Sequence, residues 1–255
     1  MYLSDLILND KEKIALGDLF LPETERAKLD DLLKEFKYAT ELSKYELPVN
    51  NKLLLSGSSG CGKTATAKGI ANALGKTLII LNLSNIISAK IGETAQNLNL
   101  VFAHIAKING VLLLDEFDQI GKARNIDDKD VGEMRRIVNT LIQLIDQLPL
   151  QSLLICATNH RSFLDPAILR RFQLQLNYTI PSPAVLDHYY DDLLSRYPEN
   201  IRSVDRIYDI SFAEAKDITL TSVKRNLINA MELVIEETNV CNRADQVTEI
   251  PAAYS

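Results

Sequence analysis

Short apolar runs alternate along most of the chain with longer stretches whose apolar residues recur at helical spacing. Such runs are typical of strands buried on both faces of a parallel sheet, and the longer stretches are typical of amphipathic helices. The alternation therefore predicts an α/β fold with a parallel sheet. The predicted strands are 52–56, 76–81, 111–114, 153–157 and 173–176. One predicted helix, 23–42, precedes them, and the helices 65–74 and 133–148 lie between them.

The alternation stops near Pro181 and Pro183, and only helical patterns follow, at 185–194, 212–216 and 221–237. Proline punctuation together with a change of pattern indicates a domain boundary. The predicted organisation is an N-terminal extension (1–16), a large α/β domain (17–181), a small all-helical domain (182–240) and a flexible tail (241–255).

The composition excludes several classes of protein. The formal net charge of −6 disfavours binding to nucleic acid, and 46% apolar residues in a chain of 255 suffice for two cores. There is no apolar run long enough to span a membrane, and the N-terminus lacks the design of a secretory signal, so we expect a cytoplasmic protein. The three cysteines, Cys61, Cys156 and Cys241, indicate neither a disulfide framework nor a zinc cluster.

The strongest motif lies between the first predicted strand and its helix, where residues from Gly57 to Thr64 fit the phosphate-loop pattern G-x-x-x-x-G-K-[ST]. Glycines let several N–H groups turn toward one anion, and the following helix points the positive end of its dipole at the same phosphates. Lys63 is expected to reach the β- and γ-phosphates of ATP, and Thr64 to bind Mg²⁺. The alternative is a Gly/Ser turn that merely precedes a helix. The predicted nucleotide-binding residues of this loop are Gly57, Ser59, Gly60, Cys61, Gly62, Lys63, Thr64 and Ala65.

A second pattern places two acids at the end of a buried strand. Asp115 and Glu116 directly follow the run 111–114, and ligands bind at the carboxyl ends of strands in open α/β sheets. We expect Asp115 in the Mg²⁺ shell and Glu116 as the group that polarises the water attacking the γ-phosphate. The alternative is a strand that simply ends in solvent.

Further polar residues follow the next strand. Asn159 should lie at the same sheet edge as Asp115, either as a strand cap or as a hydrogen-bond donor to the attacking water. Arg170 and Arg171 end a short predicted helix that starts at Asp165. They either complement the dipole of that helix or reach a γ-phosphate in a neighbouring subunit as an arginine finger.

Taken in order, these motifs resemble those of the AAA family of ATPases. The phosphate loop, the strand ending in Asp115–Glu116, the strand before Asn159 and the segment Leu164–Phe172 resemble Walker A, Walker B, sensor 1 and the arginine-finger segment of that family. The resemblance implies a P-loop NTPase three-layer sandwich with a five-stranded parallel sheet. It also implies a small helical lid domain that follows the sandwich.

The same resemblance assigns roles to residues outside these motifs. It implies that adenine packs near Leu19 and Phe20 and that ATP sites lie at the seams of a ring, usually a hexamer. The arginine-finger role then belongs to Arg170 ahead of Arg171. The lid offers no clear sensor arginine, because Lys224 and Arg225 lie on a polar helix face.

One segment departs from the family pattern. Residues Ser88–Thr94 resemble the central-pore loop of members that thread polypeptides, but Lys90 stands where an aromatic residue is usual, followed by Ile91. An aromatic ring wedges against any side chain, whereas a lysine is a hydrated point charge on a flexible stem. The departure favours an acidic or specific client over processive pulling of apolar sequence. The alternative is that Lys90 is a solvated loop residue.

The leading functional hypothesis is an ATP-hydrolysing homo-oligomeric ring that remodels a protein client, because loss of the γ-phosphate can rotate the lid against the sheet. The client would be chosen by the pore, the ring faces, or a separate adaptor or protease. Two other hypotheses are a loader or helper acting on DNA and a nucleotide-dependent scaffold with little turnover. The acidic balance disfavours the first, and the water-activating Glu116 disfavours the second.

Overall fold

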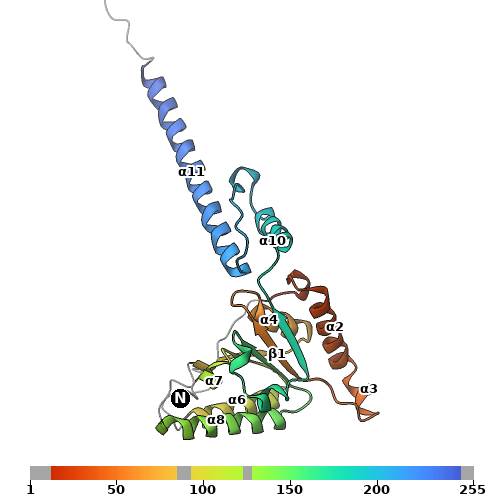
Figure 1. The fold of residues 1–255 in the computed structure, drawn as a ribbon. Coiled ribbons are helices and arrows are strands. Elements are labelled where there is room, and N and C mark those ends of the chain that lie inside the picture. Colours follow the sequence, from red (N-terminus) through yellow and green to blue (C-terminus); the bar gives the residue numbers. More distant parts are fainter. Residues whose placement is uncertain (1–12, 85–92, 123–127, 248–255) are drawn as a thin grey trace, which may run out of the picture. The chain divides into compact units, whose positions relative to one another are not determined.

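The computed structural model describes residues 13–84, 93–122 and 128–247. The chain forms two compact units that divide between Thr179 and Ile180 (Figure 1). The first unit is a sheet with helices on both faces, and the second is helical. Among the described residues there is no helix with the length and apolar character that crossing a membrane requires.

All strand pairs of the five-stranded sheet are parallel, which confirms the predicted fold class. The strand order is β2-β3-β4-β1-β5, so the carboxyl ends of β3, β4 and β1 lie side by side. This edge is where the predicted catalytic residues emerge. The strands are β1 (Lys52–Gly57), β2 (Leu78–Asn82), β3 (Val111–Asp115), β4 (Leu153–Thr158) and β5 (Leu174–Tyr178).

Apolar residues of the strands alternate between two layers. Leu54 packs in one core cluster, and its neighbours Leu53 and Leu55 pack in the other. Successive side chains of a strand point to opposite faces, so a sheet covered on both sides requires a wholly apolar run. One layer is closed by α6 (Glu93–Ile108) and α8 (Asp128–Gln147), and the other by α2 (Glu23–Lys37) and α4 (Lys63–Ala73).

Two elements of the first unit differ from the sequence-based expectation. The helix predicted for 23–42 is interrupted at Tyr38, so that a second short helix follows α2. The strand predicted from Lys76 begins two residues later, because Gly75 and Lys76 complete the end of α4: Gly75 has a φ of +62°, and the Lys76 N–H donates to the Ala71 carbonyl at 2.9 Å. The shorter elements are η1 (Leu16–Asp18), α3 (Ala39–Ser43), α7 (Gln119–Lys122), η3 (Arg161–Phe163) and α9 (Pro166–Leu169).

The second unit contains α10 (Pro183–Ser195), η4 (Glu199–Ile201) and the long helix α11 (Phe212–Val247). The sequence suggested separate helices at 212–216 and 221–237, but one continuous helix, α11, covers both. Thr219 is buried within it and donates its hydroxyl to the Ala215 carbonyl at 2.7 Å, so packing overrides the low helix propensity of the residues around it. The helix begins with a capping box, in which Ser211 and Glu214 hydrogen-bond reciprocally.

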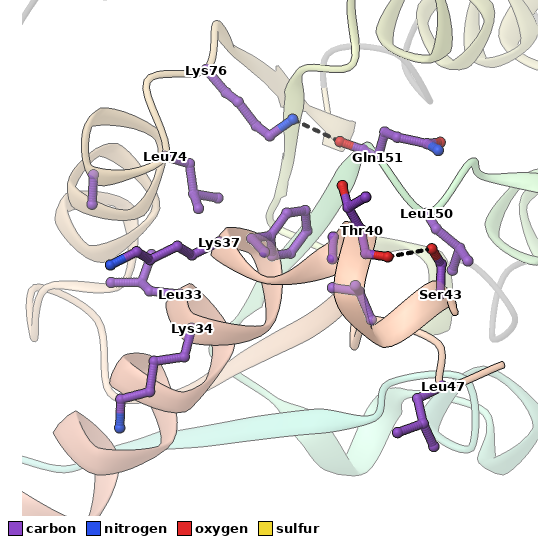
Figure 2. A pocket seen from close by; sticks show the side chains of 14 residues that line it. Leu33, Lys34, Lys37, Thr40, Ser43, Leu47, Leu74, Lys76, Leu150 and Gln151 are labelled. Carbon is purple, nitrogen blue, oxygen red and sulfur yellow. Dashed lines mark hydrogen bonds between the residues drawn. The ribbon is translucent and has the colours of Figure 1, made fainter. Parts of the chain in front are cut away.

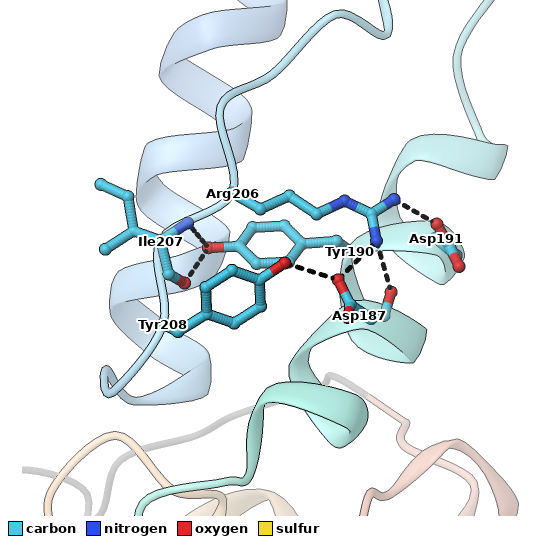
Figure 3. A network of polar contacts seen from close by, with 6 residues as sticks. All are labelled: Asp187, Tyr190, Asp191, Arg206, Ile207 and Tyr208. Carbon is cyan, nitrogen blue, oxygen red and sulfur yellow. Dashed lines mark hydrogen bonds and ion pairs between the residues drawn. The ribbon is translucent and has the colours of Figure 1, made fainter.

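A polar network ties the connection after η4 to α10 (Figure 3). The Arg206 guanidinium pairs with Asp187 at 2.7 Å and with Asp191, and the Tyr208 hydroxyl donates to Asp187 at 2.9 Å. These hydrogen bonds lower the pKa of the Asp187 carboxyl. The Tyr190 hydroxyl donates to the Ile207 carbonyl at 2.9 Å. Hydrogen bonds and ion pairs therefore hold the connection between η4 and α11 against α10.

Candidate functional site

The predicted phosphate loop connects β1 to α4 directly. Gly60 and Gly62 have φ values of +71° and +99°, in the left-handed region that favours glycine, so the backbone of the loop needs glycine at both positions. Gly57 has a φ of +129° and a second constraint, because a Cβ there would lie 1.8 Å from the carbonyl oxygen of Tyr178. The loop thus delivers its last glycine to the N-terminus of α4, where helix N–H groups are available to an anion.

A pocket of about 300 Å³ lies over this loop. It joins the loop to residues at the ends of β3 and β4, and in the strand order β4 lies between β1 and β3. Residues from three separate parts of the chain therefore meet as the sequence predicted. The lining residues are Ser59, Gly60, Gly62, Lys63, Thr64, Ala65, Asp115, Glu116 and Asn159.

Lys63 lies at the centre of the polar contacts in this pocket. Its ammonium donates to the carbonyls of Gly57 and Ser58, each at 2.8 Å, and to the Asn159 side-chain oxygen at 2.7 Å. Only 8% of the residue is exposed. Burial lowers the pKa of Lys63, while nearby acidic groups, among them the Asp115 carboxylate, oppose that shift. The ammonium therefore links the start of the phosphate loop to the residue that follows β4.

Thr64 and Asp115 form the second pair across the pocket. The Thr64 hydroxyl donates to Asp115 Oδ2 at 3.1 Å, and Asp115 Oδ1 accepts the Glu116 N–H at 2.8 Å. A hydroxyl and a carboxylate are the hard oxygen donors that Mg²⁺ prefers, and sites that use substrate phosphates need few protein ligands. The donor set therefore fits Mg²⁺, and Thr64 and Asp115 are the residues that would hold it.

Glu116 has an unusual backbone conformation. Its φ is +53°, a left-handed value that non-glycine residues adopt rarely and that is enriched at functional sites. The residue lines the pocket together with Asn159 and the phosphate loop, all of which follow the carboxyl ends of parallel strands. β3 therefore ends at the pocket, and Glu116 is one of the residues that line it.

Asp118 is a residue that the sequence analysis did not select. It is 2% exposed, and its Oδ1 accepts the Thr158 hydroxyl at 3.1 Å and the Asn159 N–H at 3.4 Å. It therefore holds the end of β4, from which Asn159 reaches Lys63. The only sequence signal was a third acid close behind Asp115 and Glu116.

The two arginines of the predicted finger segment have different surroundings. Arg171 forms a bidentate ion pair with Asp146, at 2.8 and 2.9 Å, and also donates to the Ala167 carbonyl. Arg170 caps the C-terminal end of α9, and its residue surface is exposed. An arginine that acts on another subunit must be able to reach it, so these surroundings favour Arg170.

The structure does not bring every predicted residue to the pocket. Leu19 packs against α4 near Gly69, and neither Leu19 nor Phe20 lines the pocket. The Cys61 side chain is buried in the core cluster under α4, so this residue offers only its backbone to a ligand. The proposed pore residues Lys90 and Ile91 lie outside the described residues.

A larger cavity, about 650 Å³, lies between α2, α3 and the end of α4 (Figure 2). Its walls are mainly aliphatic, with Leu33, Leu74 and Leu150 among them. Lys76 reaches into this region, but its ammonium is bound by the carbonyls of Asn109 at 2.8 Å and Gln151 at 2.7 Å. The cavity lacks the convergent acids of the smaller pocket, so its size does not make it the reactive site.

Comparison with known proteins agrees with this placement. Residues 53–180, which include most of the sheet, match the family described as "ATPase family associated with various cellular activities (AAA)". An uncharacterized AAA family ATPase of Sinorhizobium fredii is 34% identical over 223 residues, which cover 86% of this chain and 67% of that protein.

Two archaeal relatives are more distant. A proteasome-activating nucleotidase of Thermococcus gammatolerans is 30% identical over 181 residues, covering 68% of this chain and 45% of that protein. A putative 26S proteasome regulatory subunit homolog of Methanothermobacter thermautotrophicus is 26% identical over 254 residues, covering 95% of this chain and 66% of that protein. The chain thus spans less than two thirds of the length of both.

Solved structures share the fold. The crystal structure of the FIGL-1 AAA domain matches with a TM-score of 0.66 at 23% identity and covers 84% of this chain and 72% of that one. The ADP complex of the same domain matches with a TM-score of 0.66 at 24% identity.

Proposed function

This chain belongs to the AAA family of ATPases, and we propose that it binds ATP with Mg²⁺ at its phosphate loop and hydrolyses it. The observation that carries the proposal is the meeting of three strand ends in one pocket: Lys63 contacts Asn159 at 2.7 Å, and Thr64 contacts Asp115 at 3.1 Å. A scaffold would need only the phosphate loop. The acids and amide that follow β3 and β4 suit a site that activates water.

The chemistry follows from these positions. Lys63 would exchange its carbonyl and amide partners for the β- and γ-phosphate oxygens and compensate their charge. Mg²⁺, held by Thr64 and Asp115, would neutralise charge that develops on the phosphates. The Glu116 carboxylate would orient a water molecule toward the γ-phosphorus and take its proton, with Asn159 as a further hydrogen-bond partner of that water. The bond from the γ-phosphorus to the bridging oxygen then breaks, which leaves ADP and phosphate.

The proposed active assembly is a ring of identical chains, with six subunits as is usual in the AAA family. Arg170 supports it, because the residue is exposed and ends a short helix that leads away from β4. A cation supplied in trans would stabilise the charge of the transition state at the neighbouring site. Hydrolysis would then depend on assembly, and the rate per chain would rise with protein concentration.

The work coupled to hydrolysis is proposed to be remodelling of a protein client. Support comes from the two archaeal relatives, whose names associate them with the proteasome. Release of the γ-phosphate at a seam changes the contacts that position neighbouring domains, which provides a route from chemistry to force on a bound polypeptide.

The direct test is steady-state phosphate release from ATP by the wild-type chain and by Glu116→Gln. The variant keeps the shape of the side chain but loses the base, so turnover should fall by about 10²–10⁴-fold while ATP binding persists. Equal rates would remove Glu116 from the mechanism. The same variant, kept in its ATP state, should co-purify with a protein client, and Lys63→Ala, which is expected not to bind ATP, is the matched control.

A further inference from the structure

Tyr178 contacts the phosphate loop although it lies far from the loop in sequence. It is the last residue of β5 and only 6% of it is exposed. Its backbone carbonyl accepts the Ser58 N–H at 3.0 Å, and the same carbonyl oxygen is the atom that a Cβ on Gly57 would strike. The entrance of the loop is therefore held against the end of β5.

The side chain of Tyr178 reaches the other end of the same loop. Its hydroxyl donates to Thr66 Oγ1 at 2.7 Å, and the Thr66 hydroxyl donates to the Gly62 carbonyl at 3.0 Å. Each hydroxyl has one hydrogen to donate, so the two bonds form a directed chain whose members strengthen each other. Burial raises the pKa of Tyr178, which keeps the phenol protonated and able to donate.

The direction of the Gly62 carbonyl matters for nucleotide binding. In a planar trans peptide the carbonyl oxygen and the following N–H point to opposite sides. The Gly62 carbonyl is held toward α4 by the Thr66 N–H at 2.8 Å as well as by the Thr66 hydroxyl. The N–H of Lys63 is thereby directed away from the helix, to the side where an anion would bind.

We propose that Tyr178 is a positioning residue for nucleotide binding, which braces both ends of the phosphate loop from β5, and that Thr66 relays its hydroxyl contact to Gly62. The inference rests on the proposed function, because it assumes that the loop holds nucleotide phosphates. It goes further by assigning part of the affinity to residues that do not line the pocket.

The test measures ADP affinity by calorimetry for the full chain and for Tyr178→Phe, Thr66→Val and Thr66→Ser. Because the hydroxyl chain holds the loop in its binding geometry, breaking it should weaken ADP binding about five-fold in Tyr178→Phe and Thr66→Val, which corresponds to about 1 kcal/mol. Thr66→Ser keeps the hydroxyl and should bind as the wild type does. Tyr178→Phe should add nothing in the Thr66→Val background, because the chain is already broken there.

Tyr208→Phe is the matched control, since it removes a phenol hydrogen bond in the second unit. It should leave ADP affinity unchanged. Thermal unfolding without nucleotide separates positioning from general stability: a lower Tm with unchanged affinity in Tyr178→Phe and Thr66→Val would overturn the inference. If the wild type itself fails to bind ADP, the proposed function fails and the inference with it. If the wild type binds and all variants bind equally, only the inference fails.

Discussion

Replacement of Asp118 tests how the end of β4 is held at the pocket. Its Oδ1 accepts both the Thr158 hydroxyl and the Asn159 N–H. Asp118→Ala removes the acceptor of both donors. Asp118→Asn keeps an oxygen of the same shape but removes the charge. The pair of variants therefore separates the structural contact from the electrostatic one.

The magnitudes follow from these contacts. The buried Thr158 hydroxyl left without this acceptor costs about 1–3 kcal/mol, so Asp118→Ala should lower the free energy of unfolding by about 1–3 kcal/mol. Asp118→Asn should stay within about 1 kcal/mol of the wild type. The Asp118 carboxylate also opposes the lowering of the Lys63 pKa by burial. Removal of that charge should lower the pKa of Lys63 further, so the alkaline limb of the ATPase profile should move to lower pH.

Urea denaturation followed by circular dichroism measures the first effect, and steady-state ATP turnover across pH measures the second. At a temperature where Asp118→Ala is folded, displacement of Asn159 should lower kcat about ten-fold. An Asp118→Ala variant as stable as the wild type would show that the Asp118 side chain does not hold β4. An unshifted alkaline limb in Asp118→Asn would show that its charge does not act on Lys63.

Two other predictions concern the arginine pair and the start of α11. Arg170→Ala should lower turnover by about 10³-fold, whereas Arg171→Ala, whose side chain is already paired within the chain, should change phosphate release only a few-fold; equal losses would contradict the assignment. Hydrogen bonds from Ser211 lower the pKa of Glu214, so the stability that Glu214 contributes is present above its usual pKa of 4.5 and is lost as the pH falls through its lower folded value. Glu214→Gln should therefore reduce the dependence of Tm on pH below 4.5, and an unchanged slope would refute this linkage.

Much of the fold was predictable because its signals are local. A wholly apolar run such as 111–114 can hardly be anything but a strand covered on both faces, and the acids after it had to emerge at a sheet edge. The conformation of the loop from Gly57 to Thr64 was likewise predictable, because its glycines indicate a backbone that other residues rarely adopt. Parallel pairing of β1 with β4 then places Asn159 opposite the phosphate loop. The motif spacing and a parallel sheet were therefore sufficient to predict that these residues lie close together.

The contacts that support the pocket could not be read from the sequence. Thr66 and Tyr178 are 112 positions apart, and neither residue type is unusual in a helix or a strand. Asp118 looks like one more acid after β3 until its buried contacts are known. The continuity of α11 was also missed, because buried packing at Thr219 outweighs local helix propensity. These features depend on contacts between residues far apart in the sequence or on burial, which local sequence patterns do not reveal.

In the proposed assembly, a complete ATP site combines the pocket of one chain with Arg170 of a neighbouring chain. The measurement that tests it most directly mixes Glu116→Gln and Arg170→Ala chains, each nearly inactive alone, and follows phosphate release. In an equal, random mixture about one quarter of the sites would pair an intact Glu116 with an intact Arg170 from the neighbour, so activity should return to about a quarter of the wild-type rate. A mixture no more active than the sum of its parts would contradict the claim.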